Sequence, residues 1–422
     1  MLPDLVEIIP PSTRVNASVV LPGSKSLTNR ALVLAALADG EVTLRGALWS
    51  EDTQAMVHCL GHLGFEVTVS DDPSEPANRT LVVTGKGGNI PKVGSVEAPL
   101  ELFVENAGTA ARFLLAMACL GEGVFRLSGI PRMHQRPQAA LIRALRELGY
   151  RIDSPNDFLP AVVHGTGPKP GARCRVSVEE SSQFASALIL CQRTGGWEVE
   201  VTGANEDELP YVDMTRQLVE TFPWNGGLYE IEPDASGASY FWGSDWLVRG
   251  DGERVRVEPA PDSGMQRDQN FLDLILGQPW RPSYSRNSDL ADSIMTAIVL
   301  APFASGPTEF TDLGRLRVQE CERVEALRTE LGKCGARVEE HDDTLTVYPG
   351  PLHGAEIETY NDHRMAMCFG ILGLRVPGLK LRNPACVRKT FPNFFIKLAS
   401  LGVEMRDVAT GEPLSGDRLL AE

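Results

Sequence analysis

The sequence predicts an α/β protein of two domains in which buried helices are wrapped by sheets. Three observations support this fold class. The 422 residues exceed one ordinary domain, which usually holds about 100–200 residues. A short β-rich run leads into an amphipathic helix six times, and six further segments have the pattern of helices that are apolar on most sides. Each of six units then has roughly 70 residues, enough for two helices and three or four strands.

The six amphipathic helices carry apolar residues three and four positions apart. Runs and helices pair as 41–47 with 50–64, 124–130 with 136–149, 197–204 with 210–222, 254–260 with 266–277, 308–314 with 318–331, and 379–384 with 389–402. Glycines stand where helix C-terminal glycines are expected, and they are Gly64, Gly149, Gly277, Gly335 and Gly402.

The six apolar helices begin with small polar or charged residues, and their segments are 23–37, 106–120, 181–191, 234–243, 289–301 and 361–374. A helix that is apolar on most sides belongs in an interior, and Ser, Asn or Asp at its start is expected to cap free backbone amides. We therefore expect exposed and buried helices to alternate, with three units in each domain. No Pro- or Ser-rich linker marks the boundary.

The composition excludes several classes of protein. Hydrophobic residues make up 43% and charged residues 23%, as in globular proteins. A net charge of −16 argues against a general binder of nucleic acid or of anionic membranes. No apolar run approaches the roughly 18 residues that span a bilayer, and the start, MLPDLVEIIPPSTR, lacks the pattern of a signal peptide. Eight scattered cysteines predict free thiols, so we expect a cytoplasmic protein.

Cationic side chains recur at the predicted helix starts, where free N–H groups favour anions. They are Lys25, Arg30, Arg112 and Arg364 on the apolar helices, and Arg132, Arg136, Arg323 and Lys389 on the amphipathic ones. A single Arg or Lys at such a place usually lies on a solvated face. Because helix N-termini disfavour cations unless an anion is bound, the set predicts a pocket for a ligand with phosphate, carboxylate or both.

Seven motifs follow one another along the chain: PGSKSLTNR (22–30), NAGTAAR (106–112), PRMHQRP (131–137), SSQF (181–184), PYVDMT (210–215), DASGASYF (234–241) and NDHRMAM (361–367). Together they closely resemble the 5-enolpyruvylshikimate-3-phosphate (EPSP) synthase family of enolpyruvyltransferases. The resemblance runs from about residue 7 to about residue 405, and the combination is highly specific.

The resemblance implies an inside-out α/β (α+β) barrel fold of two domains, each with three βαβαββ repeats, closing over substrates in a cleft. The first domain would be 22–233 and the second 1–21 plus 234–422, with a hinge near Leu21 and Asp234. The implied reaction transfers the enolpyruvyl group of phosphoenolpyruvate to the 5-hydroxyl of shikimate 3-phosphate, through a tetrahedral adduct that loses phosphate. It serves chorismate and aromatic amino acid biosynthesis without a metal or organic cofactor, and we expect a monomer.

The resemblance also assigns residues to each ligand. Those for phosphoenolpyruvate are Lys25, Asn106, Gly108, Arg132, Gln183, Arg323, Arg364 and Lys389. Those for shikimate 3-phosphate are Lys25, Ser26, Arg30, Ser181, Ser182, Gln183, Tyr211, Asp292, Arg315 and Gln319. Gly108 would allow the backbone to approach the ligand closely.

The reaction needs carboxyl groups in opposite roles. One takes a proton from the attacking hydroxyl, and another acid protonates the methylene carbon of phosphoenolpyruvate. By similarity, Asp292 is the base and Glu320 the acid. A cation-rich pocket lowers the pKa of a carboxyl group, which suits Asp292 and opposes Glu320, so Lys25 stays a second candidate for the proton donor.

The chain departs from the family pattern on the acceptor side. Many members read N-x-R-V-K-E-[ST]-D-R where this chain has Arg315 to Arg323, so Arg315 and Gln319 replace an amide and a lysine. Glu208 stands where a serine is usual. We hypothesise that Arg315 takes over the phosphate contact of the lysine. An enolpyruvyltransferase with another hydroxyl acceptor is the alternative, and a catalytically inactive anion-binding protein is a third reading.

A metal site is not expected. His58 and His62 lie four apart on one predicted helix, but no acidic or cysteine partner stands nearby in the sequence.

Overall fold

A computed structural model describes residues 2–203, 209–249 and 252–421. The chain divides into two compact units, one formed by Met1–Pro22 with Pro233–Glu422 and the other by Gly23–Glu232. The backbone therefore passes between the units at residues 22–23 and 232–233, and a hinge at these points stays a prediction. The end of the run expected at 197–204 and the residue Glu208 lie outside the described residues.

Buried helices form the interior of the 23–232 unit. Helices α1 (Lys25–Leu37), α3 (Gly108–Ala118) and α5 (Ser182–Gly195) contact one another and are buried along nearly their whole length. The more exposed helices α2 (Glu51–His62), α4 (Ala139–Glu147) and α6 (Leu209–Thr221) pack on them. In α4 the apolar residues Leu141, Ile142 and Leu145 are buried, as the periodicity of the sequence requires.

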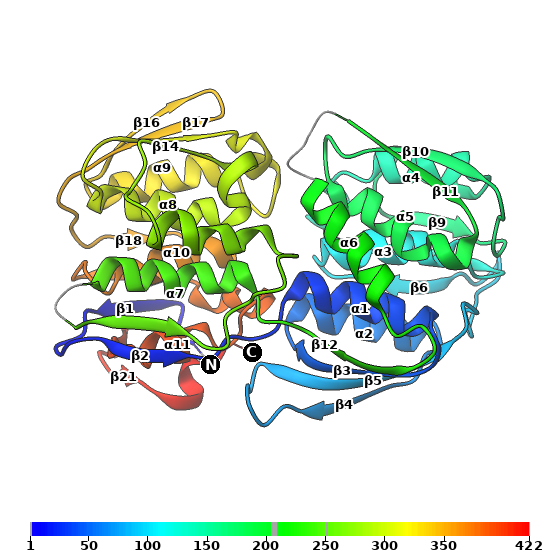
Figure 1. Cartoon of the computed structure of the whole chain (residues 1–422), viewed down its shortest axis with the longest axis horizontal. Coiled ribbons are helices and arrows are strands. Elements are labelled where there is room, and N and C mark those ends of the chain that lie inside the picture. The colour runs from blue at the N-terminus through cyan, green and yellow to red at the C-terminus, as the bar shows by residue number, and fades with distance from the viewer. Residues whose placement is uncertain (1, 204–208, 250–251, 422) are drawn as a thin grey trace. The chain divides into compact units, whose positions relative to one another are not determined.

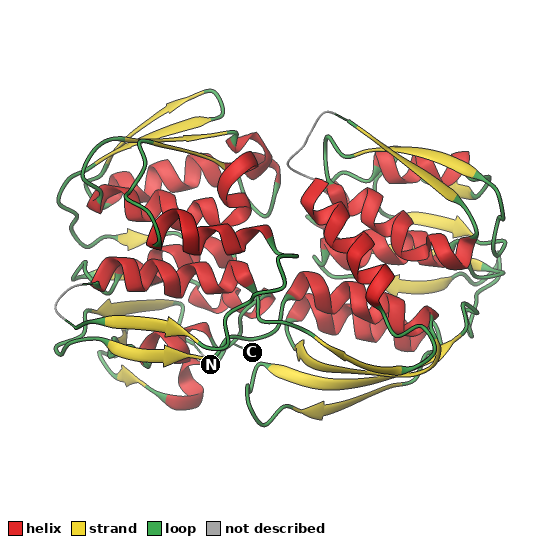
Figure 2. Cartoon of the chain, in the orientation of Figure 1, coloured by secondary structure: helices red, strands yellow, loops and turns green. Residues whose placement is uncertain are grey.

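Strands surround these helices, as Figures 1 and 2 show. One sheet has the order β12 (Gly227–Glu230), β3 (Asp39–Leu48), β5 (Asn78–Lys86) and β4 (Val67–Asp71). A second has the order β6 (Leu100–Phe103), β7 (Val124–Ser128), β9 (Ala161–His164) and β8 (Arg151–Asp153), and β10 (Arg173–Ser177) pairs with β11 (Glu198–Thr202). Each sheet contains one parallel pair, β12 with β3, β6 with β7 and β10 with β11.

The other unit repeats this plan. Helices α7 (Ala235–Val248), α8 (Ile294–Leu300) and α10 (His363–Leu372) contact one another and are buried. Helices α9 (Arg323–Lys333) and α11 (Phe394–Ala399) pack at their edges. One sheet has the order β18 (Glu356–Ile357), β19 (Leu379–Arg382), β1 (Leu5–Ile9), β20 (Glu404–Asp407) and β21 (Pro413–Leu414). A second has the order β14 (Ser283–Ser285), β15 (Thr308–Thr311), β17 (Thr344–Tyr348) and β16 (Arg337–His341). In a third, β13 (Arg254–Val257) pairs with β2 (Asn16–Val19).

The first strand of the chain belongs to this second unit. Strand β1 lies between β19 and β20 and is antiparallel to both. Its alternate residues Val6 and Ile8 are fully buried, which is the pattern of a strand with one face on the core. The register is therefore fixed, because a shift by one residue would turn both side chains away from the core.

Four of the expected helices are wrong in detail, and those expected from residues 318 and 389 begin at Arg323 and Phe394. The segment 266–277 forms a 3₁₀ turn at Arg267–Gln269 and a π turn at Leu272–Leu276, and Gly277 has φ −85°, unlike the left-handed Gly64 at +87°. The helix expected from residue 289 begins at Ile294, after irregular turns. Side chains account for the late start of the helix at Ile294, because Asp268 and Ser285 accept hydrogen bonds from backbone amides of the preceding segment and so compete with regular helix formation.

Candidate active site

Helix starts in the 23–232 unit are of two kinds. At α5 the hydroxyl of Ser181 accepts from the amide of Gln183 at 3.2 Å, as expected for a capped helix. At α1 and α3 no side-chain cap hydrogen bond is formed. The expectation of a polar cap is therefore wrong for these two helices. Their first turns present backbone N–H groups that favour an anion.

Lys25 opens α1 and is held by a carboxylate. Its Nζ lies 3.1 Å from Oδ2 of Asp52, and the Asp52 side chain is only 4% exposed. Lys25 itself is 22% exposed, so its ammonium group is accessible from solvent while the ion pair fixes its direction. Sequence reasoning missed Asp52, which lies in the first turn of α2.

Of the two arginines in PRMHQRP, Arg136 places its guanidinium group beside Gly108, whereas the sequence analysis chose Arg132. A Cβ atom at Gly108 would lie 2.7 Å from Nη2 of Arg136 and 2.4 Å from Nη1 of Arg112. Arg136 Nη1 also donates to the carbonyl of Asn106 at 3.0 Å. Arg132 instead donates to Oε1 of Gln135 at 3.1 Å. Both arginines stand in the motif PRMHQRP, and only the three-dimensional structure separates them.

Arg30 is buried among neutral groups. Its Nε donates to Oγ1 of Thr215 at 2.8 Å, Nη2 donates to Oγ of Ser186 at 3.1 Å, and Nη1 donates to the carbonyl of Ser26 at 3.0 Å. The guanidinium carbon lies 5.3 Å above the Phe113 ring. Burial lowers the pKa of Arg30 to about 10, partly offset by Tyr211. The group therefore stays cationic at neutral pH.

Other residues assigned to the acceptor lie near Arg30 in the same unit. Ser181 and Ser182 are buried at the start of α5. The carbonyl of Tyr211 accepts from Oγ1 of Thr215, the same side chain that accepts from Arg30. The structure therefore links the starts of α1 and α6 through Thr215.

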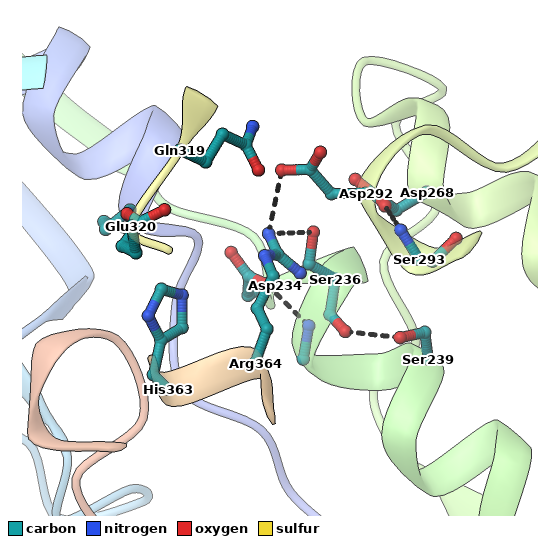
Figure 3. Close-up of polar contacts among 12 residues, drawn as sticks. Asp234, Ser236, Ser239, Asp268, Asp292, Ser293, Gln319, Glu320, His363 and Arg364 are labelled. Carbon is teal, nitrogen blue, oxygen red and sulfur yellow. Dashed lines mark hydrogen bonds and ion pairs between the residues drawn. The ribbon is translucent and has the colours of Figure 1, made fainter. Parts of the chain in front are cut away.

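Asp292 lies between two guanidinium groups in the second unit. Its Oδ2 is 3.2 Å from Nη2 of Arg364, and its Oδ1 is 3.1 Å from Nη2 of Arg286. Arg364 also donates to Oγ of Ser236 and to the hydroxyl of Tyr240, at 3.3 Å each. Figure 3 shows the Arg364 side chain directed at both Asp292 and Ser236.

Arg323 pairs with two carboxylates that stand just before α9 and α10. Its Nη2 lies 2.9 Å from Oε2 of Glu320, and its Nε lies 2.7 Å from Oδ2 of Asp362. Its Nη1 donates to the side-chain oxygen of Gln319. The structure thus brings the predicted residues Arg323, Glu320 and Gln319 together, and it adds Asp362, which the sequence analysis did not select.

The charges in this cluster shift its pKa values. Burial alone would raise the pKa of Asp292, but Arg364, Arg286 and Arg323 outweigh it and hold the pKa well below its ordinary value. Burial and the charge of Asp292 raise the pKa of Asp268 to about 6, against the opposing effect of Arg364. Asp292 is therefore ionised at neutral pH.

Two predicted cations of this unit lie on 3₁₀ segments. Lys389 ends the segment Pro384–Lys389 and is 7% exposed. Arg315 lies in the segment Leu313–Val318 and is partly exposed. Both precede a helix in the chain, α11 and α9 respectively.

The described residues contain neither a metal-binding cluster nor a membrane-spanning helix. No group of three or more His, Cys, Asp or Glu side chains there could hold a metal ion. Within the same ranges, no helix is long and apolar enough to cross a membrane. All eight cysteines are described and are free thiols.

Comparisons with known proteins agree on one family. The family described as EPSP synthase (3-phosphoshikimate 1-carboxyvinyltransferase) matches residues 9–226 and 224–398. A 3-phosphoshikimate 1-carboxyvinyltransferase of Opitutus terrae is 39% identical over 95% of this chain and 98% of its own length. One of Rhizobium etli is 37% identical over 95% and 98%.

Solved structures show the same fold. An EPSP synthase of Acinetobacter baumannii superposes with a TM-score of 0.74 at 20% identity, over 96% of this chain and 100% of that one. The enolpyruvyl transferase NikO of Streptomyces tendae gives a TM-score of 0.68 at 17% identity, over 96% and 99%. The expected fold class is confirmed.

Proposed function

The chain belongs to the EPSP synthase family, the 3-phosphoshikimate 1-carboxyvinyltransferases, and we propose which of its residues carry out the family reaction. The enzyme transfers the enolpyruvyl group of phosphoenolpyruvate to the 5-hydroxyl of shikimate 3-phosphate and releases phosphate. This reaction belongs to the shikimate pathway, which leads to the aromatic amino acids.

The donor is assigned to lysine and arginine cations with a few polar neighbours. Phosphoenolpyruvate carries a phosphate and a carboxylate, which guanidinium groups bind in a bidentate manner. We assign Arg136 in place of Arg132, because Arg136 lies against Gly108. The full set is Lys25, Asn106, Gly108, Arg136, Gln183, Arg323, Arg364 and Lys389.

The residues assigned to the acceptor are the polar groups around Arg30 and, by the family resemblance, Asp292. Arg30 supplies a buried cation, and Ser181 and Ser182 supply hydroxyl groups at the start of α5. The full set is Lys25, Ser26, Arg30, Ser181, Ser182, Gln183, Tyr211 and Asp292, with Arg315 and Gln319 beside the phosphate. Glu208, which departs from the family pattern, lies outside the described residues.

The chemistry proceeds by addition and elimination. The acceptor oxygen forms a bond to C2 of phosphoenolpyruvate while its proton passes to Asp292. The former double bond takes a proton at C3 from Glu320, which gives a tetrahedral adduct with a methyl group. Elimination then returns a methyl proton to Glu320 and breaks the bond from C2 to the phosphate oxygen. The leaving phosphate takes the proton from Asp292, so both carboxyl groups are restored.

One observation carries the assignment of the base: Asp292 is held ionised between Arg286 and Arg364. An ionised carboxylate can accept a proton, and the surrounding cations stabilise the charge that develops on the adduct. Glu320 is the assigned acid. In the structure its carboxylate is paired with Arg323 and would have to be protonated before it could donate, so Lys25 stays the alternative donor of this proton.

The experiment that tests the function measures phosphate release from phosphoenolpyruvate with shikimate 3-phosphate and with a panel of other hydroxyl acceptors, including nucleotide and amino sugars. We expect turnover with shikimate 3-phosphate alone. Turnover with another acceptor, and none with shikimate 3-phosphate, would overturn the assignment.

We further propose that the enzyme acts as a monomer in the cytoplasm. The buried thiol side chains support this location, since free cysteines are typical of reducing compartments. Size-exclusion chromatography with light scattering tests the oligomeric state, and a mass near 46 kDa is expected from the chain mass of 45.9 kDa.

A further inference from the structure

Arg286 is a buried arginine beside the assigned base, and no ligand has been assigned to it. It starts the π turn Arg286–Leu290, and its side chain is only 5% exposed. The preceding Ser285 fixes this turn, because its hydroxyl accepts from the amides of Asn287 and Ser288 at 3.0 Å each. The guanidinium group thus approaches Asp292 from a turn that side-chain hydrogen bonds hold.

The two oxygens of Asp292 are held in different ways. Oδ1 bonds Arg286, while Oδ2 bonds Arg364, which also has neutral partners in Ser236 and Tyr240. Arg364 is assigned to the donor, whose anionic groups compete for its guanidinium. When Arg364 turns to the donor, Oδ2 is released, and Oδ1 keeps its bond to Arg286.

We propose that Arg286 is a positioning residue for the reaction: it anchors Oδ1 of Asp292 so that Oδ2 is the atom that takes the proton from the acceptor hydroxyl. The inference rests on the proposed role of Asp292. It adds an arginine that holds the base, distinct from the arginines assigned to substrate anions.

Charged groups from several elements face Asp292. Arg364 comes from α10, Arg323 from α9 and Arg286 from the turn itself. Asp268, from the turn Arg267–Gln269, accepts from the amide of Ser293 and is sensitive to the charge of Asp292. Loss of Arg286 removes one of the cations that lower the pKa of Asp292. The pKa should therefore rise, and most of all when the donor has engaged Arg364.

The test compares the pH dependence of kcat for the wild-type enzyme with that of Arg286→Gln and Arg286→Lys. In Arg286→Gln we expect the acid limb to move up by about 1 pH unit or more. We expect kcat at neutral pH to fall by about 10-fold to 100-fold, since the carboxylate loses its anchor. The KM for phosphoenolpyruvate should stay within about 3-fold, because its binding cations are retained.

Arg286→Lys keeps the charge and loses the planar fork. We expect its acid limb to stay within about half a pH unit of the wild-type limb, with kcat between those of the other two enzymes. Arg281→Gln is the matched control: this arginine lies just before β14 and is 43% exposed. Its profile should superimpose on that of the wild type.

A fall in kcat of the same size at every pH in Arg286→Gln, with an unmoved acid limb, would overturn the proposal. If Arg286→Gln does not fold, Arg286→Lys decides, and an unchanged kcat in that variant would overturn it. Asp292→Asn distinguishes a failure of the proposed base from a failure of the role of Arg286. Turnover retained in Asp292→Asn means that the assignment of the base has failed, whereas turnover lost there with an unmoved limb in Arg286→Gln means that only this inference has failed.

Discussion

Arg323 and Asp362 form a bidentate ion pair in which both side chains are almost fully buried. Nε of Arg323 lies 2.7 Å from Oδ2 of Asp362, and Nη2 lies 3.2 Å from Oδ1, with exposures of 1% and 0%. Asp362 also accepts from the amide of Arg364 at 2.9 Å and so caps α10. One carboxylate therefore fixes the first residue of α9 and the first turn of α10, from which the assigned donor-binding arginines project.

Removal of the charge at Asp362 should destabilise the fold. Asp362→Asn can keep the helix cap, but the buried positive charge of Arg323 is then only partly neutralised. Breaking a buried ion pair costs about 3–5 kcal/mol. Guanidinium chloride unfolding measures the free energy. Asp4→Asn, which breaks an exposed pair with Arg382, is the control and should change it by less than about 1 kcal/mol. Equal effects of the two substitutions would contradict the role of Asp362.

The choice of Arg136 over Arg132 can be tested with a matched pair. Arg136→Gln removes the guanidinium beside Gly108, and we expect the KM for phosphoenolpyruvate to rise about 10-fold or more, the loss of a charged hydrogen bond. Arg132→Gln should leave this KM within about 2-fold. Steady-state kinetics with varied phosphoenolpyruvate measures both KM values. A larger effect of Arg132→Gln than of Arg136→Gln would assign Arg132 to the donor instead.

Gly108 and Arg136 also show where sequence reasoning stops. The motifs correctly indicated the fold, the buried helices and the family, because apolar periodicity and polar helix starts are local features of the chain. The order within PRMHQRP could not show which arginine turns toward Gly108, since that depends on how residues 131–138 pack against α3. The irregular turns before Asp292 were missed for a similar reason: Asp268 bonds Ser293, 25 residues away, and the sequence pattern does not record this contact.

Asp268 should make stability depend on pH. Its pKa is about 6 in the folded protein and near 3.8 in the unfolded chain, so the folded state holds a proton between these values that the unfolded state has released. The stabilisation that comes from this tighter proton binding is fully present below about pH 4 and is lost as the pH rises through 6. Asp268→Asn cannot titrate.

The free energy of unfolding of the wild type, relative to Asp268→Asn, should therefore fall by on the order of 3 kcal/mol from pH 4 to pH 7. Denaturant unfolding at a series of pH values measures this difference. Parallel curves for the two proteins would show that Asp268 keeps an ordinary affinity for its proton.

Substitution of Arg315 tests whether this residue replaces the usual lysine as a contact of the acceptor phosphate. If Arg315 makes the phosphate contact that a lysine makes in many relatives, Arg315→Ala should raise the KM for shikimate 3-phosphate by about 10-fold, the effect of a lost charge-assisted bond. The KM for phosphoenolpyruvate should change little. A KM for shikimate 3-phosphate at the wild-type value would refute the hypothesis. Arg328→Ala, a surface arginine on α9 paired with Glu340, is the control.

The most direct measurement is a comparison of turnover and ligand affinity in Asp292→Asn. The amide keeps the shape of the side chain and an oxygen for Arg286, but it cannot accept the proton. We expect kcat to fall by about 100-fold or more, with dissociation constants for both substrates, measured by calorimetry, within about 5-fold of the wild type. Turnover within about 3-fold of the wild-type value would contradict the account, because the proton would then have another acceptor.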